Sequence, residues 1–427
     1  MGEHPRLLMV GVDHQALEVI NTGGAPDGVD VTVLMGGQAK DIGLPLPRET
    51  RVIFVDDATS IDACMNALTR CGATDFDAVY ALDDQAMMAA SALGCLLGAR
   101  SLPARTVSMF RDKYLQKRVL RQAGVVVARH ELIADIHDLL PGYRLSFDKA
   151  VIKPIAGQAT ESTYLVHSTE DVRRIGLDRK ARGLRARTFV VEEFMDGEEW
   201  FADGVVSGGQ VRFASLGRYG KTCLEAVNES SPVRTFCLDP VTDKVCYEAA
   251  MPLVAKALST LGLTDSVFHL ELFHQPCGGI AFGECAARRG GGPIRDQVRY
   301  KFGVDLAYHG VRALLETGSA DSIATTVVDG EVASAYLPLA HGTLLDHPSV
   351  QELLAQPDVV SARIFVPKGT RTLRPAANTF GRMGEFTVHT APGEAAARLD
   401  EVSRWFESRV RVLPLTPTMR ELRALNS

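Results

Sequence analysis

The segment SVFHLELFHQPCGGIAFGECAARRGGGPI, residues 266–294, is the most informative part of this sequence. Its pattern predicts two short strands, VFHLELF and GIAFGEC, joined by a two-residue turn at Cys277-Gly278. An arginine pair and a glycine run follow, and they lead into a helix at Pro293, a favoured position for proline. With this turn, Glu271 pairs directly with Glu284 across the hairpin.

The facing glutamates need an explanation, because like charges opposite each other on neighbouring strands repel. Their neighbours Leu270, Leu272, Ile280 and Phe282 predict a largely buried sheet. An unpaired carboxylate is costly in such a place. A divalent cation resolves the conflict, and two carboxylates suit a hard ion such as Mg2+. The alternative is an exposed hairpin edge with two solvated glutamates.

The composition is that of an ordinary globular protein, with 427 residues of which 46% are hydrophobic and 23% charged. The formal net charge of -6 gives no electrostatic footprint for nucleic acid or for an anionic membrane. The longest uncharged run, residues 85–99, is shorter than the ~18 residues of a membrane span and predicts a buried helix. The N-terminal apolar stretch is too short for a signal peptide, and eight cysteines without a C-x-x-C pair fit a reducing compartment. We therefore expect a cytoplasmic protein that binds neither nucleic acid nor membrane.

From residue 6 the chain alternates apolar strands with amphipathic helices, which predicts a parallel sheet covered on both faces. No G-x-G-x-x-G fingerprint follows the first strand, which argues against a dinucleotide site. Asp83 and Asp84 end the fourth strand, where open α/β sheets bind ligands. The two aspartates could either contact a substrate or cap the helix that follows. The expected strands are RLLMVGV, VDVTVLM, RVIFVDD and DAVYALDD, and the expected helices span residues 15–21, 61–70 and 85–97.

Two lysines stand in segments that suit phosphate binding. Lys113 lies in a helix predicted over residues 106–123, where a solvated charge is the alternative. Lys153 ends an apolar strand, and the small, hydroxyl-rich loop of residues 156–163 follows it. An ammonium group and several donors therefore come together there. The segment lacks the GK[ST] of a Walker A loop, and an ordinary hairpin is the alternative.

The segment FVVEEFMDGEEWFADGVV, which begins at Phe189, could hold a purine nucleoside. Backbone groups beside Met195 would bond the base, and a carboxylate a few residues later would take the ribose hydroxyls. A charged edge strand that blocks aggregation is the alternative. Beyond about residue 325, three strands and a helix over residues 394–410 predict a smaller α+β unit with Trp405 in its core.

Five motifs occur in a consistent order and spacing, namely RDK at 111–113, VIKPIAG at 151–157, VEEFMDGEE at 191–199, HLE at 269–271 and GECAARRGG at 283–291. Together they resemble the ATP-grasp ligases. The E-x-x-x-R-x-G-G pattern from Glu284 resembles the carboxylate-amine ligase branch, which includes bacterial L-amino-acid (dipeptide) ligases.

The resemblance implies an α/β and α+β chain with an ATP-grasp fold. An N-terminal Rossmann-like parallel-sheet domain would cover residues 1–105, and the ATP-grasp domain would cover residues 106–325. A mobile lid would lie within it, over roughly residues 125–190. A small C-terminal α+β domain would cover residues 326–427.

The resemblance also implies roles in binding ATP. Lys113 and Lys153 would contact the phosphates. Glu271 and Glu284 would hold Mg2+, or Mn2+ in its place, between the β and γ phosphates. The adenine pocket and the ribose contact would be formed by Glu192, Glu193, Met195 and Glu199.

Arg288 would stabilise an acyl phosphate and the tetrahedral intermediate that follows it. The implied reaction joins a small-molecule carboxylate, here of an amino acid, to an amine and releases ADP and phosphate, as in dipeptide and natural-product biosynthesis. Many relatives form homodimers, so a homodimer is an expected state. The candidates for substrate contact are His269 and Arg295, followed by His274, Trp200 and the pair Asp83-Asp84.

Two features depart from the usual family pattern. Ala286 stands where many relatives have Asn, and the lid loop has fewer glycines than usual. Two other functions fit the same motifs, namely a carboxylase-like or purine-biosynthetic ATP-grasp enzyme and a non-catalytic ATP-binding module. The presence of Arg288 and of both hairpin glutamates favours the ligase.

Overall fold

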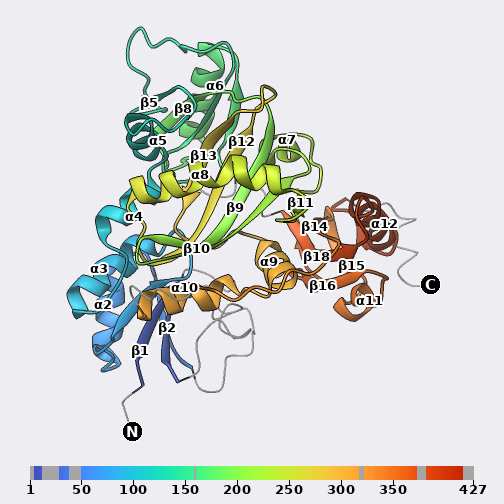
Figure 1. Ribbon diagram of the computed structural model, residues 1–427. Coiled ribbons are helices and arrows are strands. Elements are labelled where there is room, and N and C mark those ends of the chain that lie inside the picture. The colour runs from blue at the N-terminus through green and yellow to red at the C-terminus, as the bar shows by residue number, and fades with distance from the viewer. Residues whose placement is uncertain are drawn as a thin grey trace.

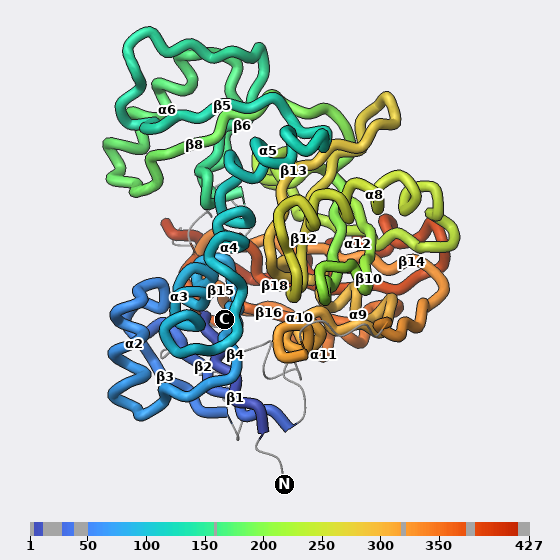
Figure 2. Tube along the Cα trace, turned by 60° about the vertical axis from the view of Figure 1, so that its left-hand side comes forward, coloured from blue at the N-terminus to red at the C-terminus, as the bar shows by residue number. Residues whose placement is uncertain are grey.

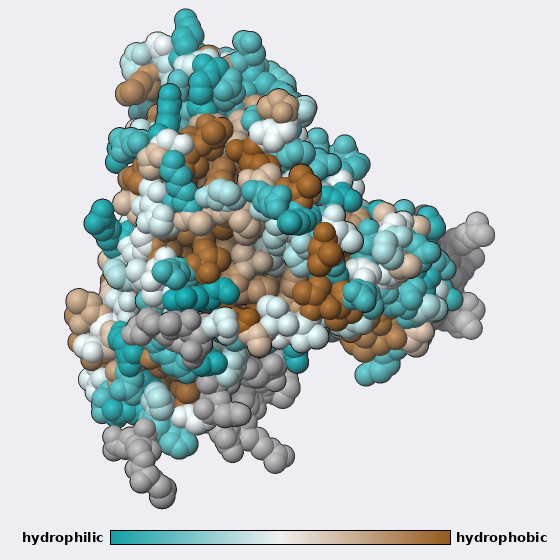
Figure 3. Space-filling view, in the orientation of Figure 1, coloured by the Kyte–Doolittle hydropathy of each residue, from teal (hydrophilic) through white to brown (hydrophobic). Residues whose placement is uncertain are grey.

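The computed structural model describes residues 4–11, 28–37, 50–157, 160–316, 322–372 and 381–416. A large sheet fills the middle of the molecule, with the N-terminal sheet below it and a small sheet above it (Figure 1). The view in Figure 2 keeps these two sheets at opposite ends of the molecule. In the orientation of Figure 1, hydrophilic residues cover the upper end around α6, and apolar residues gather nearer the middle (Figure 3).

The N-terminal sheet has the strand order β3-β2-β1-β4, and all of its strands are parallel. Apolar residues from its strands and helices pack into a continuous core, so the predicted parallel α/β unit is confirmed. The helix expected over residues 15–21 lies outside the described residues. The elements are β1 Arg6–Gly11, β2 Asp30–Gly36, β3 Arg51–Val55, α2 Ile61–Arg70, β4 Ala78–Ala81 and α3 Met87–Leu97.

The single helix predicted over residues 106–123 is wrong. The structure has two helices, α4 Ala104–Arg111 and α5 Lys113–Gln122, separated at Asp112. Asp112 has an extended backbone conformation, and its side chain accepts a hydrogen bond from the N–H of Leu115. An aspartate that caps a new helix competes with helix continuation, which explains the break. Lys113 therefore begins α5, next to the cleft described below.

The small sheet lies over the large one and has the strand order β5-β8-β6-β7, with antiparallel pairing throughout. Lys153 is the penultimate residue of β6, so the predicted strand end is confirmed. Ser168 caps the helix that follows, because its side chain accepts from the N–H of Asp171. The elements are β5 His130–Ile133, β6 Ala150–Pro154, β7 Tyr164–Val166, α6 Thr169–Ala181 and β8 Phe189–Glu193.

The large sheet has eight strands in the order β13-β12-β9-β10-β11-β14-β18-β16, all paired antiparallel. Its C-terminal strands join the sheet through the pairing of β11 with β14. Trp405, on the C-terminal helix α12, packs against the core beside these strands. The strands are β9 Glu198–Ser207, β10 Gln210–Tyr219, β11 Arg234–Cys237, β12 Ser266–His274, β13 Ile280–Ala286, β14 Glu331–Pro338, β16 Val359–Ile364 and β18 Arg382–Thr390.

Helices cover the two faces of the large sheet differently. On β12, Phe268, Leu270 and Leu272 pack with the apolar side of α8, whereas Val267 packs with α9 and α10. Because side chains alternate along a strand, His269 and Glu271 share the face of Val267. The remaining elements are α7 Cys223–Asn228, α8 Lys244–Leu261, α9 Ile294–Phe302, α10 Leu306–Leu315, β15 Gly342–Asp346, α11 Val350–Leu354, β17 Arg371–Thr372, α12 Ala395–Glu407 and β19 Arg411–Leu413.

Within the described ranges, no helix combines the length and the apolar character needed to cross a bilayer. The uncharged run at residues 85–99 instead forms α3, whose residues Met87, Leu93 and Gly94 are buried. The prediction of a buried helix at this place is therefore confirmed.

Candidate active site

The β12–β13 hairpin turns through three residues, so the predicted two-residue turn is wrong. The N–H of Gln275 donates to the carbonyl of Gly279 at 2.8 Å, and the N–H of Gly278 donates to the carbonyl of Gln275 at 2.8 Å. Gly278 has a φ of 83°, a conformation that a glycine adopts without strain. Three-residue loops with a left-handed glycine at this place are a common hairpin type.

A bulge at Gly283 then restores the predicted pairing of the glutamates. Leu272 pairs with Phe282, but Glu271 pairs with Glu284, so one extra residue is inserted in β13. The longer turn and the bulge shift the register in opposite directions, and their effects cancel. Because of the bulge, Phe282 joins the core under α8 while Glu284 lines the cleft. The facing pair of carboxylates is confirmed.

The close approach at the bulge favours a glycine. A Cβ atom on Gly283 would lie 3.0 Å from the carbonyl oxygen of Glu271 and 3.2 Å from the ring of Phe273. Such contacts are tighter than ordinary van der Waals packing allows. The glycine in GEC therefore allows the two strands to approach closely at the glutamate pair.

The two glutamates line a cleft of about 280 Å³. Residues from all three regions contribute to its walls. From the N-terminal region come Leu82, Asp83 and Asp84, from the small sheet and the turn that follows it Lys153, Glu192 and Met195, and from the large sheet and its loops Glu199, His269, Glu271, Glu284, Arg288 and Arg289. Segments far apart in the sequence therefore meet at one site.

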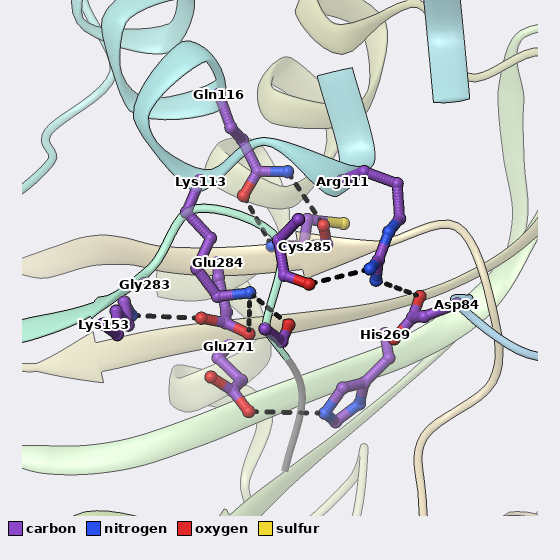
Figure 4. A network of polar contacts seen from close by, with 12 residues as sticks. Asp84, Arg111, Lys113, Gln116, Lys153, His269, Glu271, Gly283, Glu284 and Cys285 are labelled. Carbon is purple, nitrogen blue, oxygen red and sulfur yellow. Dashed lines mark hydrogen bonds and ion pairs between the residues drawn. The ribbon is translucent and has the colours of Figure 1, made fainter. Parts of the chain in front are cut away.

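Lys113 and Lys153 both reach Glu284, as Figure 4 shows. The Nζ of Lys113 lies 3.5 Å from one carboxylate oxygen, and the Nζ of Lys153 lies 3.1 Å from the other. Burial alone would raise the pKa of Glu284, but Lys113, Lys153 and Lys117 together hold its pKa well below its ordinary value. Glu284 is therefore an ionised carboxylate between ammonium groups, a place where phosphate oxygens would find cations.

On the other side of the pair, Glu271 is next to a histidine. The Nε2 of His269 lies 3.7 Å from Glu271, and its Nδ1 lies 2.9 Å from a carboxylate oxygen of Asp203 (Figure 4 shows the first contact). Burial would lower the pKa of His269, but Asp203 and Glu271 raise it to about 10. The other carboxylate oxygen of Asp203 accepts from the N–H of Gly290 at 2.7 Å. Asp203 therefore links the hairpin to the glycine run.

Glu199, which the resemblance assigns to the ribose, is buried and lines the cleft. Its Oε2 accepts a hydrogen bond of 2.7 Å from the N–H of Cys223, at the start of α7. Burial, and next the charge of Glu271, raise the pKa of Glu199 to about 8. This carboxyl group therefore stays protonated at pH values at which an ordinary glutamate is ionised.

The two residues of the acidic pair 192–193 differ in environment. Glu192 is buried and lies 2.9 Å from the Nζ of Lys117 and 3.4 Å from the Nζ of Lys153. Glu193 pairs at the surface with Arg129 and also lines the cleft, together with Met195. Alternation along β8 explains why neighbouring glutamates have such different partners.

Lys117 was not predicted as a site residue. Its side chain is fully buried, and its Nζ donates to the carbonyl of Gly283 at 2.5 Å as well as pairing with Glu192. Lys117 stands four residues after Lys113 on α5, so both lysines project from one side of that helix. This i, i+4 spacing is a signal that the sequence offers, although it does not reveal which carboxylate the second lysine meets.

The structure separates the roles of Asp83 and Asp84. Asp83 accepts hydrogen bonds from the N–H groups of Gln85 and Ala86, in the turn that precedes α3, whose N-cap residue Ala86 has no side-chain cap. Asp84 is buried and accepts from the Nε of Arg288 at 2.7 Å. Burial would raise the pKa of Asp84, but Arg288 and Arg111 hold it below its ordinary value. The N-terminal region therefore positions the arginine of the E-x-x-x-R motif.

The other substrate candidates lie apart from the cleft walls. Arg295 is buried in α9, where its guanidinium contacts Asp305 through two bonds of 3.1 and 2.6 Å. His274 stacks on Trp200 with ring centroids 4.5 Å apart. None of Arg295, His274 and Trp200 is among the described residues that line the cleft, whereas His269 is.

Comparisons with known proteins agree with the fold. No family model matches the chain. The L-arginine-specific L-amino acid ligase of Bacillus subtilis is 21% identical over 328 residues, which cover 74% of this chain and 76% of that protein.

Solved structures also resemble this chain in their fold. An L-amino acid ligase from Bacillus licheniformis superimposes with a TM-score of 0.80 at 19% identity, over 97% of this chain and 100% of the other. A carboxyaminoimidazole ribonucleotide synthase from Aspergillus clavatus, complexed with ATP, gives a TM-score of 0.69 at 15% identity, over 95% of this chain and 100% of the other. The chain has the ATP-grasp fold, and the resemblance to L-amino acid ligases holds over most of its length.

Proposed function

We propose that this protein is an ATP-dependent ligase that activates a carboxylate as an acyl phosphate and couples it to an amine. The main support for this proposal is the arrangement of charges in one cleft. The facing carboxylates Glu271 and Glu284 lie beside the ammonium groups of Lys113 and Lys153, and Arg288 lines the same cleft. The similarity to L-amino acid ligases supports an amino acid as the carboxylate substrate.

The donor set fits a hard divalent ion bound together with a nucleotide. Among the described residues, no group of three or more His, Cys, Asp or Glu side chains forms a metal site of its own. Glu271 and Glu284 would therefore supply the protein's oxygen ligands for Mg2+, or for Mn2+, while phosphate oxygens and water would complete the coordination. The bound ion would neutralise charge on the phosphates during transfer.

Lys113 and Lys153 would bind the phosphates of ATP, since both ammonium groups lie at the glutamate pair. Glu192, Glu193 and Met195 would line the adenine pocket, and Glu199 would bind the ribose. The small sheet would act as a mobile lid, roughly residues 125–190, which excludes water from the reactive acyl phosphate. We further propose domain boundaries near residues 105 and 325, a homodimer as the assembly and the cytoplasm as the compartment.

The proposed reaction has two steps. A carboxylate oxygen of the substrate attacks the γ-phosphorus of ATP, and the bond to the leaving ADP breaks. The amine nitrogen then attacks the acyl carbon, phosphate leaves with the carbon–oxygen bonding pair, and the amine loses a proton. Arg288 would stabilise the negative charge that develops on the acyl phosphate and on the tetrahedral intermediate. Asp84 would hold the guanidinium in place through the 2.7 Å bond to its Nε.

A direct assay tests this proposal. Purified protein with ATP, Mg2+ and a panel of L-amino acids, which includes L-arginine, should release ADP and phosphate only with an acceptable carboxylate. Hydroxylamine in place of the amine should yield a hydroxamate, which reports the acyl phosphate itself. Mass spectrometry then identifies the amide product. No carboxylate-dependent release across the panel would contradict the ligase function.

A second candidate is a carboxylase-like or purine-biosynthetic ATP-grasp enzyme, which the likeness to the carboxyaminoimidazole ribonucleotide synthase favours. ADP release that depends on bicarbonate or on a ribotide, with no amide product, would support it. A non-catalytic ATP-binding module would bind nucleotide without turnover in every arm of the assay.

A further inference from the structure

A buried arginine lies beside the small sheet, on α6 at the upper end of the molecule (Figure 1). Arg179 is only 1% exposed, and no carboxylate of the described residues lies within ion-pair distance of it. Its Nη1 donates to the hydroxyls of Ser162 at 2.7 Å and Tyr164 at 3.3 Å, and its Nη2 donates to the carbonyl of Ala186 at 3.0 Å. The guanidinium also lies 4.8 Å from the ring centroid of Phe189. A buried cation among neutral groups is costly, so its position calls for an explanation.

The hydroxyl of Ser162 belongs to a turn at the cleft, residues 160–163, which we call the cleft turn. The N–H of its last residue donates to the carbonyl of its first at 3.1 Å. Three of its residues line the cleft, namely Thr160, Glu161 and Thr163. Ser162 and Arg179 are not among the described lining residues. The cleft turn therefore faces the cleft on one side and contacts Arg179 on the other.

The backbone of the cleft turn is strained. Thr160 has a φ of 58° and Ser162 a φ of 57°, and both values lie in the left-handed region that favours glycine. Residues in such conformations persist where surrounding interactions fix them, and they are concentrated at functional sites. The hydrogen bond from Arg179 to the hydroxyl of Ser162 is one interaction that fixes this turn.

Arg179 is itself held firmly in place. Val172 and Ile175 of α6 pack into the core of the small sheet. A Cβ atom on Gly176, which is three residues before Arg179, would lie 2.0 Å from the carbonyl oxygen of Ile136, so the helix packs closely there. The planar guanidinium can bond several partners at once, which a lysine cannot do with the same geometry. It thereby ties the cleft turn to the segment that leads into β8.

We propose that Arg179 is a positioning residue, which fixes the cleft turn so that its hydroxyl and N–H groups meet the phosphates of ATP. Such groups are suitable donors to phosphate oxygens. The inference rests on the proposed ATP-dependent function and adds a residue outside the cleft that sets the affinity for phosphate. Arg179 acts through Ser162 and does not contact the nucleotide. Its uncompensated charge favours the same ligand, because a cation in a poorly solvated place attracts anions nearby.

The test compares a ligand that has phosphates with one that has none. Calorimetry measures the affinity of the full-length protein for a non-hydrolysable ATP analogue in the presence of Mg2+, and competition against that analogue measures the affinity for adenosine. The variants are Arg179→Met, Arg179→Lys, Ser162→Ala and the double variant of Arg179→Met with Ser162→Ala. Arg173→Met is the matched control, because Arg173 is exposed on the same helix.

We expect Arg179→Met to bind the analogue about 10-fold more weakly, which is the effect of one charge-assisted hydrogen bond. Adenosine affinity should change by less than about twofold, because adenosine has no phosphate for the cleft turn to bind. Ser162→Ala should lose about 3- to 10-fold for the analogue alone. The double variant should be no more than about twofold weaker than Arg179→Met, since both changes remove the same bond. Arg179→Lys should lie between the wild type and Arg179→Met, and Arg173→Met should match the wild type.

Two results would overturn the proposal. Equal losses for the analogue and adenosine in Arg179→Met would show that Arg179 serves the fold of the small sheet. Wild-type affinity of Ser162→Ala for the analogue would show that Arg179 does not act through the cleft turn. If Arg179→Met does not fold, Ser162→Ala decides by the same measurements, because Ser162 is only partly buried and its change leaves the core intact. Failure of the proposed function is a different outcome, since the wild type itself would then bind no analogue or form no hydroxamate.

Discussion

Replacement of Lys117 by methionine tests whether the buried ammonium organises the site. The change removes a 2.9 Å contact with Glu192 and a 2.5 Å hydrogen bond to the carbonyl of Gly283, while a side chain of similar length fills the space. Among the residues that the structure describes, Lys153, at 3.4 Å, then remains as the cation partner of Glu192. Removal of one partner from a buried pair typically costs about 3–5 kcal/mol. Because Lys153 remains, we expect a loss of about 3 kcal/mol in the free energy of unfolding.

Urea unfolding of four proteins measures this loss, namely the wild type, Lys117→Met, Glu192→Gln and the double variant. If the two side chains stabilise each other, the double variant loses about 1–3 kcal/mol less than the sum of the single losses. Lys244→Met is the matched control, because Lys244 is exposed in α8 and its pairing with Glu248 is a surface contact. A loss in Lys117→Met no larger than the ~0.5 kcal/mol typical of a surface change would show that the buried ammonium group does not stabilise the fold.

Four further predictions use the same cleft. Glu284→Gln should keep the fold but lower ADP release by at least about 100-fold, since a neutral amide is a poor ligand for Mg2+, and full activity in Mg2+ would exclude this role. Arg288→Ala should lose ligation by about 100-fold or more while calorimetry shows nearly unchanged ADP binding, and an equal loss of both would contradict its assignment. The pKa of Glu199 is about 8 in the folded chain against an ordinary 4.5, so the folded state binds the extra proton and the stability of the nucleotide-free protein should fall as pH rises through that window. Glu199→Gln should flatten this slope in thermal unfolding, and an unchanged slope would exclude Glu199 as its source. Gly283→Ala should cost about 1 kcal/mol in urea unfolding and also slow turnover, because its Cβ would lie 3.0 Å from the carbonyl of Glu271, and wild-type values for both would show that the bulge tolerates a side chain.

The pairing of Glu271 with Glu284 was predicted correctly, although the predicted turn of the hairpin was wrong. The sequence predicted a two-residue turn, whereas the structure has a three-residue loop and a bulge at Gly283. The pairing of Glu271 with Glu284 survives because the two register shifts cancel. Alternation of apolar residues indicates which side chains face the core, but a one-residue insertion is visible only when the partner strand is in place.

The interactions that the sequence missed are long-range polar contacts of charged side chains. Asp84 and Arg288 are 204 residues apart, and Lys117 lies 166 residues before Gly283. The break at Asp112 was also missed, since a capping side chain competes with a helical pattern that otherwise continues. Arg295 has the residue type expected of a substrate contact, but Asp305 holds its guanidinium.

Most local elements and the order of the motifs, from the parallel N-terminal strands to the carboxylate pair of the hairpin, were predictable from the amino-acid sequence. Those features depend on periodicity and on neighbours a few residues away, which a single chain displays directly. Which charges are compensated became visible in the folded chain, because a Coulomb interaction depends on distance and burial rather than on sequence separation. That is why Arg288 and Arg289, adjacent in the chain and alike in chemistry, have different environments. Asp84 pairs with the first at 2.7 Å, whereas the second donates to the carbonyl of Gly290 at 3.4 Å.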